Sequence, residues 1–461
     1  MAQPRFFLEI LRPKIYNQCM DFLIAFIIFL ASMTASVIWN FSMLIPLVIG
    51  YFAFSAVAIH RGLKAKDIAG CTARGFKKGF IVIIVMLCIG VLTAMWRAGG
   101  TILWFVYYGV QIITPHVFIL VAFLLCAILS YALGTSFGVA GTMGYILMTI
   151  GAASGANLVL TGGAIMSGIY FGDRCSYASS SAILTAMLTE TDMQKNVPMM
   201  LKTGWIPIGS AAVLYGVLSY FYPMTNTDTS WILASITNDY NISWPLVVPA
   251  LIMFILPLFR LPIWLTMLIS AGIGFICAVF VQGDSALATL IACFAGVTEA
   301  RGEMGQLLLG GGMISMVEVS AILILSCSYS EIFESADMLK SVTEKMEKMI
   351  GRLGRFLSTY IIGIASCAIF CNQTIGDIVT VNVIGKAHKA SGGTPDEFAM
   401  DIENSLILSA GIVPWCLACK VPLTLMGAGI SSVPFAFSLY FIPIYYYFAK
   451  KRFFKESKGK L

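Results

Sequence analysis

A run of polar residues interrupts an otherwise apolar stretch of the sequence, Gly162–Thr191. The charged members of this run are Asp173 and Arg174, and among its hydroxyl residues are Ser176 and Ser180. In hydrocarbon a charged side chain costs about 2.5–3.5 kcal/mol on insertion scales, so such residues face a bundle interior or a water-filled cavity and are functional candidates. We interpret the stretch as an interrupted membrane helix that holds a cation or proton site.

The oxygen atoms in this run suit a hard cation such as Na⁺. Asp173, Ser176 and Ser180 fall at positions i, i+3 and i+7, and they share one face if the segment is helical. Gly172 lets a preceding half-helix end, Asp173 or Ser176 can cap the next one, and the carbonyls freed at such a break carry partial negative charge. The same carboxylate can hold a proton, because burial disfavours its charged form. Competition at Asp173 is therefore the simplest mechanism for cation/proton exchange.

Two other interpretations of this run stay open. In the first, Asp173 and Arg174 form a structural pair at a helix end near the membrane interface, although the cluster of hydroxyls favours a functional site. In the second, the chain is an Na⁺- or H⁺-coupled carrier of a small organic acid or amino acid, and Arg174, Asn372 and Gln373 bind that substrate.

A comparable polar break is expected in the second half of the chain. Asn372, Gln373, Thr374 and Asp377 follow the apolar segment 356–370. Amide oxygens can ligate a cation or bind an organic substrate, but such residues also form ordinary hydrogen bonds between membrane helices. Elsewhere in this half, one carboxyl residue lies inside an apolar run, and we consider it a candidate proton carrier: Glu318.

A third polar segment precedes the central stretch and reads GTSFGVAGTMG from Gly134. Its small residues allow close helix packing, or they mark another break at which Thr135 and Ser136 face a cavity. A phosphate-binding loop is not expected, because no Gly-Lys-Ser/Thr follows. Weaker candidates are Asn157, His116 and Lys420, and His116 is expected at the membrane interface because it follows Pro115 near the start of a span.

The composition is that of a polytopic membrane protein. Of 461 residues, 59% are hydrophobic and 11% are charged, whereas soluble domains carry about 25% charged residues. The net charge of +6 does not indicate nucleic acid, because Lys and Arg concentrate in loops, as the positive-inside rule predicts. Most of the 12 cysteines lie in apolar segments, and Cys416 and Cys419 are expected to pack rather than to do redox chemistry. Membrane lipid is the expected partner, and no cofactor is indicated.

The hydrophobic pattern predicts about ten to twelve crossings in two halves. An odd number of crossings in the first half would invert the second, and two inverted halves with polar breaks are typical of secondary transporters. The predicted parts are a cytoplasmic N-terminus (1–18), a first repeat (19–222), an external linker (223–243), a second repeat with a cytoplasmic amphipathic segment (244–450, with 331–355), and a basic cytoplasmic tail (451–461).

The motifs resemble those of NhaC-type sodium/proton antiporters, within the larger ion-transporter superfamily. The similarity is strongest at GTSFGVAGTMG and SGIYFGDRCSYASSSAILTA, and it extends over most of the chain, including GGMISMVEVS and DIENSLILSAGIVPW. The family's aspartate falls on Asp173 and its next serine on Ser176. Tyr177 stands where the family often has proline, and Ser180 stands where it has a second aspartate. The resemblance implies an inverted repeat with broken helices, often dimeric.

The predicted function is Na⁺/H⁺ antiport across a bacterial cytoplasmic membrane by alternating access, with both termini inside. The resemblance leaves a second option, because relatives of this family exchange organic acids and one anionic ligand is missing at Ser180. A membrane enzyme is not indicated, because the chain has neither HExxH nor GxSxG and only three histidines. Homodimerisation stays an expectation.

Overall fold

The computed structural model describes residues 21–454, apart from short gaps at residues 22, 37, 40, 113, 178, 226–229, 260, 300, 306–307, 337, 339–342 and 344. Within this part of the chain the regular structure is helical, except for one isolated antiparallel bridge between Val297 and Gly310. The predicted all-α architecture is therefore confirmed. The predicted N-terminal segment 1–18 and residues 455–461 of the tail lie outside the described residues.

The first half contains long helices that alternate with short, broken ones. Its elements are α2 (Leu44–His60), α3 (Ala65–Ala98), α4 (Thr101–Ile112), α5 (Phe118–Leu133), α6 (Ser136–Val139), a π-helical turn (Ala140–Gly144), α7 (Tyr145–Ala153), α8 (Leu158–Cys175), α9 (Ser180–Leu188) and α10 (Met193–Phe221).

The second half follows after α11 (Ser230–Asp239). Its elements are α12 (Val248–Ile255), α13 (Ile263–Phe280), α14 (Ala286–Ala295), α15 (Gly302–Gly305), α16 (Val317–Ser335), α18 (Met346–Leu353), α19 (Arg355–Phe370), α20 (Gln373–Ala390), α21 (Pro395–Glu403), α22 (Leu406–Ser409), α23 (Leu417–Met426) and α24 (Phe437–Phe453).

Several of these helices can cross a membrane. Four segments of the described chain are long and apolar enough on their own, and a fifth is a pair bent by 61° between Ala98 and Thr101. Seven shorter apolar helices accompany them. The protein is thus a polytopic membrane protein, while the number of crossings and the inverted relation of the halves stay predictions. The four long segments are Pro115–Leu133, Ser136–Ala153, Met193–Phe221 and Met313–Ser335.

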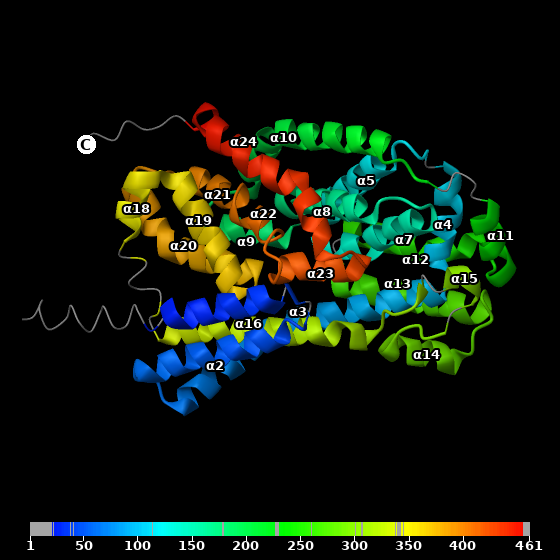
Figure 1. The fold of residues 1–461 in the computed structure, drawn as a ribbon, viewed down its shortest axis with the longest axis horizontal. Coiled ribbons are helices and arrows are strands. Elements are labelled where there is room, and N and C mark those ends of the chain that lie inside the picture. The colour runs from blue at the N-terminus through cyan, green and yellow to red at the C-terminus, as the bar shows by residue number, and fades with distance from the viewer. Residues whose placement is uncertain are drawn as a thin grey trace, which may run out of the picture.

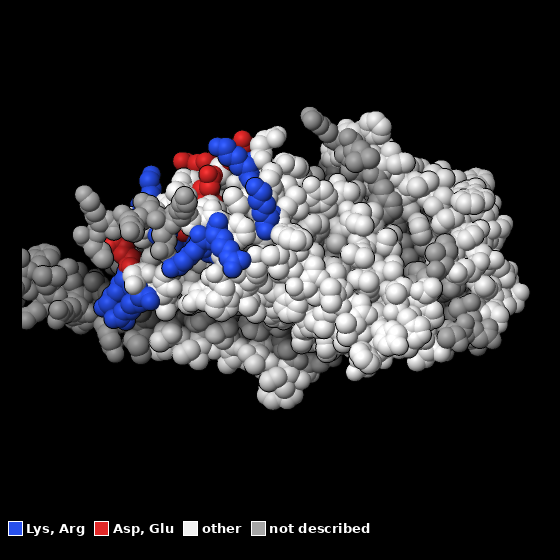
Figure 2. Space-filling model, turned by 90° about the horizontal axis from the view of Figure 1, so that it is seen from above, with Lys and Arg blue, Asp and Glu red and all other residues white. Residues whose placement is uncertain are grey.

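The helices form an elongated bundle in which segments distant in sequence lie side by side (Figure 1). α3 and α16 pack along one edge together with α2, whereas α10 and α24 pack together on the opposite edge. In Figure 2 the charged side chains of the described residues on that face gather toward one end, near α18 and the end of α24, and the remainder of the face carries none. This separation of charge fits a bundle whose apolar length lies in lipid.

The closest approach that positions the central stretch is between α8 and α5. Gly172 lies against the backbone of Ser130, and a Cβ added at Gly172 would lie only 1.9 Å from the Ser130 carbonyl carbon. The Ser130 hydroxyl in turn donates to the Ile169 carbonyl. Glycine is therefore required for the two helices to meet here, and this contact fixes the end of α8 that carries Asp173.

Two sequence-based predictions are wrong. The segment 331–355 is not one amphipathic helix, because residues 331–335 end α16 and the buried Glu331 pairs with Arg74 at 2.7 Å. The polar composition of 386–401 predicts a loop, but this stretch is mostly helical, since α20 runs to Ala390 and α21 begins at Pro395. In both cases tertiary packing overrode the polar composition of the segment. The predicted linker 223–243 contains α11, and its external location stays a prediction.

Candidate functional site

Asp173 lies in the last turn of α8, at the break before α9. α8 ends at Cys175 and α9 begins at Ser180, so the predicted interruption of this stretch is confirmed. The sequence suggested that the helix ends at Gly172, but α8 continues through this residue, which packs against α5, and ends at Cys175. The Asp173 side chain is only 7% exposed. A buried carboxylate thus stands beside helix-terminal carbonyls that carry partial negative charge.

The hydroxyls around this break differ from those expected. The Ser179 side chain caps α9, and it also donates to the Asp173 carbonyl, to which Ser181 donates at 2.9 Å. Ser176 is buried at the end of α8, whereas Ser180 is exposed. The i, i+3, i+7 spacing therefore does not place its three residues on one helical face, because the chain leaves the helix between them. Neither Asp173 nor Ser176 caps α9.

The Asp173 carboxylate is contacted from three directions. The Gln373 side-chain amide donates to its Oδ2 atom at 3.2 Å from the other half of the chain. The hydroxyl side chains of Ser181 and Ser136 also interact with it. Two hydroxyl residues and one amide residue therefore surround a single buried carboxylate, and their oxygens are the kind of ligand that an Na⁺ site uses.

Ser136 reaches this site because the chain breaks before it. Gly134 ends α5 in the left-handed region, with φ of 65°, and Thr135 then caps α6 by accepting the Gly138 N–H at 3.2 Å. The π-helical turn that follows is another departure from regular helix. Of the two interpretations of this small-residue segment, the structure has the break, and it places Ser136 at Asp173 and Thr135 in the helix cap.

A matching break positions Gln373 in the second half. Cys371 adopts a left-handed conformation, with φ of 54°, and Asn372 caps α20 by accepting the Ile375 N–H at 3.3 Å. Gln373 is the first residue of α20 and therefore points from the helix N-terminus toward Asp173. Thr374 is exposed and takes no part in this contact.

Behind this group lie two further buried carboxylates. Asp377, on α20, accepts a hydrogen bond from Thr185 of α9 at 2.7 Å and is 1% exposed. Glu403, at the end of α21, is 0% exposed and interacts electrostatically with Asp173, Asp377 and Arg174. Sequence reasoning missed Glu403 as a candidate, although the motif DIENSLILSAGIVPW that contains it was already part of the family resemblance. The mostly apolar run that follows Glu403 in the sequence was the signal that could have identified this carboxylate as buried.

Arg174 is buried, and its hydrogen bonds go to groups other than Asp173, while its Nε atom has no hydrogen-bond partner among the described residues. Its guanidinium donates to the Met200 carbonyl at 2.9 Å, the Thr203 hydroxyl at 2.7 Å and the Asn404 side-chain oxygen at 2.6 Å. None of the ion pairs found among the described residues joins Arg174 to Asp173. The alternative in which these two neighbours form a structural pair is therefore wrong, because adjacent helical residues point in different directions.

Four other sequence candidates lie outside this group. Asn157 caps the opposite end of α8, accepting the Leu160 N–H at 3.1 Å. That end is about 24 Å from Asp173 at 1.5 Å per residue. Glu318 accepts a hydrogen bond from Ser42 at 2.9 Å, and His116 is exposed and packs beside Tyr220. The remaining one is half-buried on α23: Lys420.

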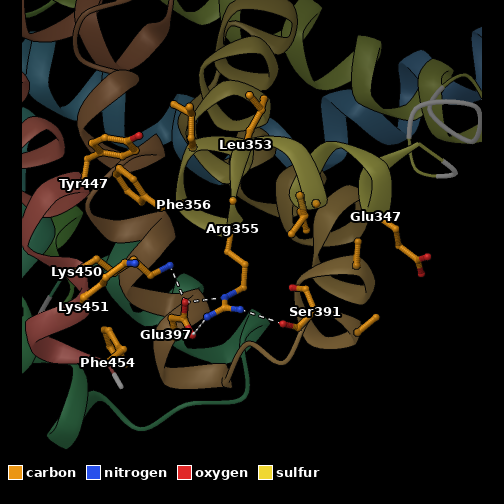
Figure 3. A pocket seen from close by; sticks show the side chains of 16 residues that line it. Glu347, Leu353, Arg355, Phe356, Ser391, Glu397, Tyr447, Lys450, Lys451 and Phe454 are labelled. Atoms are coloured by element: carbon orange, nitrogen blue, oxygen red, sulfur yellow. Dashed lines mark hydrogen bonds and ion pairs between the residues drawn. The ribbon is translucent and has the colours of Figure 1, made fainter. Parts of the chain in front are cut away.

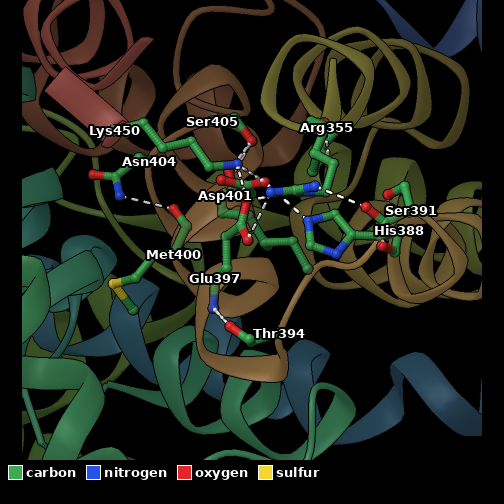
Figure 4. Close-up of polar contacts among 12 residues, drawn as sticks. Arg355, His388, Ser391, Thr394, Glu397, Met400, Asp401, Asn404, Ser405 and Lys450 are labelled. Carbon is green, nitrogen blue, oxygen red and sulfur yellow. Dashed lines mark hydrogen bonds and ion pairs between the residues drawn. The ribbon is translucent and has the colours of Figure 1, made fainter. Parts of the chain in front are cut away.

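A separate polar cluster lies where α19, α20, α21 and α24 meet. Lys450 contacts Glu397 at 2.7 Å and Asp401 at 2.6 Å, and Arg355 donates to both oxygens of Glu397. Arg355, Glu397 and Lys450 line a pocket of about 530 Å³ (Figure 3). In Figure 4 the Asp401 carboxylate is surrounded by the cationic side chains and by His388, whose ring contacts it at 3.1 Å.

This cluster is a charge-paired junction. One atom from each of His388, Glu397 and Asp401 lies within 4.8 Å of the others, a spacing that a metal ion could use. Lys450 and Arg355 already supply the positive charge to these carboxylates, so the residues do not need a metal for balance. Burial would raise the pKa of Glu397, but Arg355 and Lys450 more than offset this effect, so that the pKa is lowered.

The sequence has relatives among characterised transporters. It is 28% identical to the malate-2H(+)/Na(+)-lactate antiporter of Bacillus subtilis over 80% of this chain and 81% of that protein. It is 26% identical to the Na(+)/H(+) antiporter NhaC of Bacillus subtilis over 87% of this chain and 90% of that protein, and 22% identical to NhaC of Alkalihalophilus pseudofirmus over 87% and 88%. Residues 168–448 match the family described as the Na+/H+ antiporter family. The resemblance to NhaC-type proteins is thus confirmed, and this chain belongs to the Na+/H+ antiporter family.

Proposed function

We propose that the protein is a secondary antiporter that exchanges Na⁺ for H⁺, with Asp173 as the shared binding group. The observation that carries this proposal is the convergence of three chain breaks on one buried carboxylate. α8 supplies Asp173, the segment after α5 supplies Ser136, and the start of α20 supplies Gln373. Broken helices that meet near the middle of a bundle are where secondary transporters bind their ions.

The polar groups at Asp173 suit both occupants. Ser136 and Ser181 have hydroxyl oxygens that can ligate Na⁺, and the Ser136 hydrogen can stabilise the empty carboxylate, whereas the Ser181 hydrogen is donated to the Asp173 carbonyl. Gln373 donates through its amide nitrogen in this structure, and a half-turn of the amide would offer its oxygen to a cation instead. Protonation of Asp173 would remove the charge that attracts Na⁺, so the two ions exclude each other.

The exchange would be driven by ion gradients and by the membrane potential. The potential is worth about 2.3 kcal/mol per elementary charge per 100 mV, which matters whenever the numbers of H⁺ and Na⁺ differ. We further propose that the protein lies in a bacterial cytoplasmic membrane with both termini inside, as its basic loops suggest. The homodimer that the family resemblance implies is part of the same proposal.

A second candidate function is exchange of a small organic acid, coupled to Na⁺ or H⁺. It is favoured by the similarity to a malate/lactate antiporter and by the serine at position 180, where NhaC-type relatives carry an aspartate. Arg174 is a poor candidate to bind such an acid, because it is fully buried and both of its terminal nitrogens already donate to neighbouring residues. An organic anion would have to use Gln373, Asn372 and the hydroxyls.

Everted membrane vesicles test both candidates in one assay. A respiration-generated pH gradient is followed by a fluorescent dye while Na⁺, Li⁺ or K⁺ is added, with a panel of organic acids alongside. Collapse of the gradient by Na⁺ alone supports cation/proton exchange. A response only to an organic acid supports the second candidate and contradicts the first.

A further inference from the structure

Asp377, Glu403 and Thr185 form a buried acidic group on three separate elements. Asp377 lies on α20, Glu403 ends α21, and Thr185 lies on α9, and these three helices pack against one another. Their exposed fractions are 1%, 0% and 0%. The group lies near the Asp173 site, and the Glu403 carboxylate interacts electrostatically with Asp173.

The hydrogen bonds in this group leave the carboxylates incompletely satisfied. Thr185 donates to Asp377 Oδ2 at 2.7 Å and also interacts with Glu403. A hydroxyl carries one hydrogen, so it cannot donate to both carboxylates at once. The other Asp377 oxygen and both Glu403 oxygens have no hydrogen-bond partner among the described residues. Buried acceptors without a partner are destabilising, and a bound proton or cation would remove this cost.

The charged groups around Asp377 and Glu403 also leave an excess of negative charge. Asp173, Asp377 and Glu403 carry three negative charges when ionised, and Arg174 offsets one of them. The other buried acidic residues of α21, Glu397 and Asp401, are paired with Arg355 and Lys450, so these two cations are already committed. A net charge of about −2 therefore remains in a low-dielectric interior, where unpaired charges are strongly disfavoured.

We propose that Asp377, Glu403 and Thr185 form a second cation-binding site, which takes up one positive charge in addition to the charge held at Asp173. The charge is carried by a proton or by an alkali-metal cation, and the carboxylate and hydroxyl oxygens suit either. The proposal deepens the proposed antiport, because a loaded carrier would then hold two positive charges instead of one. It rests on the proposed function only in taking Asp173 as the first site.

Binding to the purified full chain tests this site without transport. Equilibrium binding of radioactive sodium counts Na⁺, and infrared spectroscopy near neutral pH measures the absorption of protonated carboxyl groups. If an alkali cation occupies the site, Glu403→Gln should lower the count from two Na⁺ to one. If a proton occupies it, Glu403→Gln should leave the Na⁺ count unchanged and remove one carboxylic-acid band. Asp377→Asn should behave in the same way.

Two further variants serve as controls. Asp396 also lies on α21 but is exposed, so Asp396→Asn should change neither the Na⁺ count nor the infrared bands. Thr185→Val keeps both carboxylates and removes the shared hydroxyl, and it should weaken Na⁺ binding at least tenfold or shift the carboxyl band. Unaltered Na⁺ counts and infrared bands in folded Glu403→Gln and Asp377→Asn proteins would overturn the second site. Absence of Na⁺-driven proton movement by the wild type would instead contradict the proposed antiport, and the binding result would stand.

Discussion

The Gln373 amide donates to the Asp173 carboxylate at 3.2 Å, although the two residues are 200 positions apart in sequence. Each residue lies at a break in a helix, Asp173 where α8 ends and Gln373 where α20 begins. The contact thus joins the two halves of the chain at the proposed ion site. A change of occupant at Asp173 would alter this hydrogen bond to the second half of the chain, and alternating access needs such a coupling between the halves.

Replacing the carboxylate should abolish exchange. In Asp173→Asn the side chain keeps its shape but can neither hold a proton nor attract Na⁺, so the Na⁺-induced collapse of the pH gradient should fall to background. Ser180→Ala is the matched control on the same segment, because Ser180 is exposed, and its activity should stay near that of the wild type. Normal exchange in Asp173→Asn would remove Asp173 from the mechanism.

Removing the Gln373 amide should weaken ion binding without preventing folding. Gln373→Ala takes away the side-chain oxygen that is proposed to turn toward Na⁺, and if that contact contributes as much as a hydrogen bond to a charged group, about 1.5–3 kcal/mol, the half-saturating Na⁺ concentration should rise by about tenfold to a hundredfold. Thr374→Ala tests the neighbouring exposed position and should have little effect. The dependence of gradient collapse on Na⁺ concentration measures both. Equal effects of the two substitutions would argue against a specific role for Gln373.

The close contact between α5 and α8 predicts a stability defect. In Gly172→Ala the new methyl group would meet the Ser130 backbone, and overpacking of this kind costs about 1–3 kcal/mol or more. Gly209→Ala is a suitable control, because nothing lies within 4 Å of a Cβ at that helical position. Thermal unfolding of the purified variants should show a lowered midpoint for Gly172→Ala only. A similar midpoint for both would mean that the helices separate easily here.

Arg174 is expected to act through structure and not through substrate choice. Arg174→Gln removes donors to Met200, Thr203 and Asn404, and with them a buried positive charge. Such losses destabilise by about 3–5 kcal/mol. The thermal midpoint should therefore fall, while any remaining transport keeps the wild-type preference among cations and organic acids. A changed substrate preference in a stable protein would instead support the organic-acid carrier with Arg174 as a ligand.

The junction around Glu397 predicts a dependence of stability on acid pH. α21 is not among the candidate spans, and the pKa of Glu397 is lowered from its ordinary value of 4.5, with the effects of Arg355 and Lys450 exceeding that of burial. A carboxyl group whose folded-state pKa is lowered stabilises the fold fully above its unfolded-state pKa, and this stabilisation is lost as the pH falls through the folded-state value. The thermal midpoint should thus drop below about pH 4.5.

Glu397→Gln isolates this contribution. The variant should be less stable than the wild type near neutral pH, and the difference between the two midpoints should shrink as the pH is lowered below that range. Asp396→Asn changes an exposed carboxyl group on the same helix and serves as the control. A difference between Glu397→Gln and wild type that is constant with pH would show that the pair with Arg355 and Lys450 is not the cause.

The apolar composition and the polar interruptions by themselves determined the membrane class, the all-α architecture and two of the chain breaks. Such features are local, because an apolar run of sufficient length must be a helix in lipid and a charged or glycine-rich interruption must be accommodated by a break. The same local logic failed at α21. Its polar sequence suggests a loop, yet Phe398–Glu403 is buried and helical, because Arg174, Arg355 and Lys450 meet its polar side chains from other elements.

Only the tertiary structure decided which polar residues share a site. The spacing of Asp173, Ser176 and Ser180 suggested one helical face, but the chain leaves the helix at Cys175, and Ser181 and Ser136 reach the carboxylate instead. Gln373 and Glu403 reach the same region from the second half of the chain. Contacts between residues some 200 positions apart depend on how helices pack in three dimensions, and this packing has no signature in the local periodicity of the sequence.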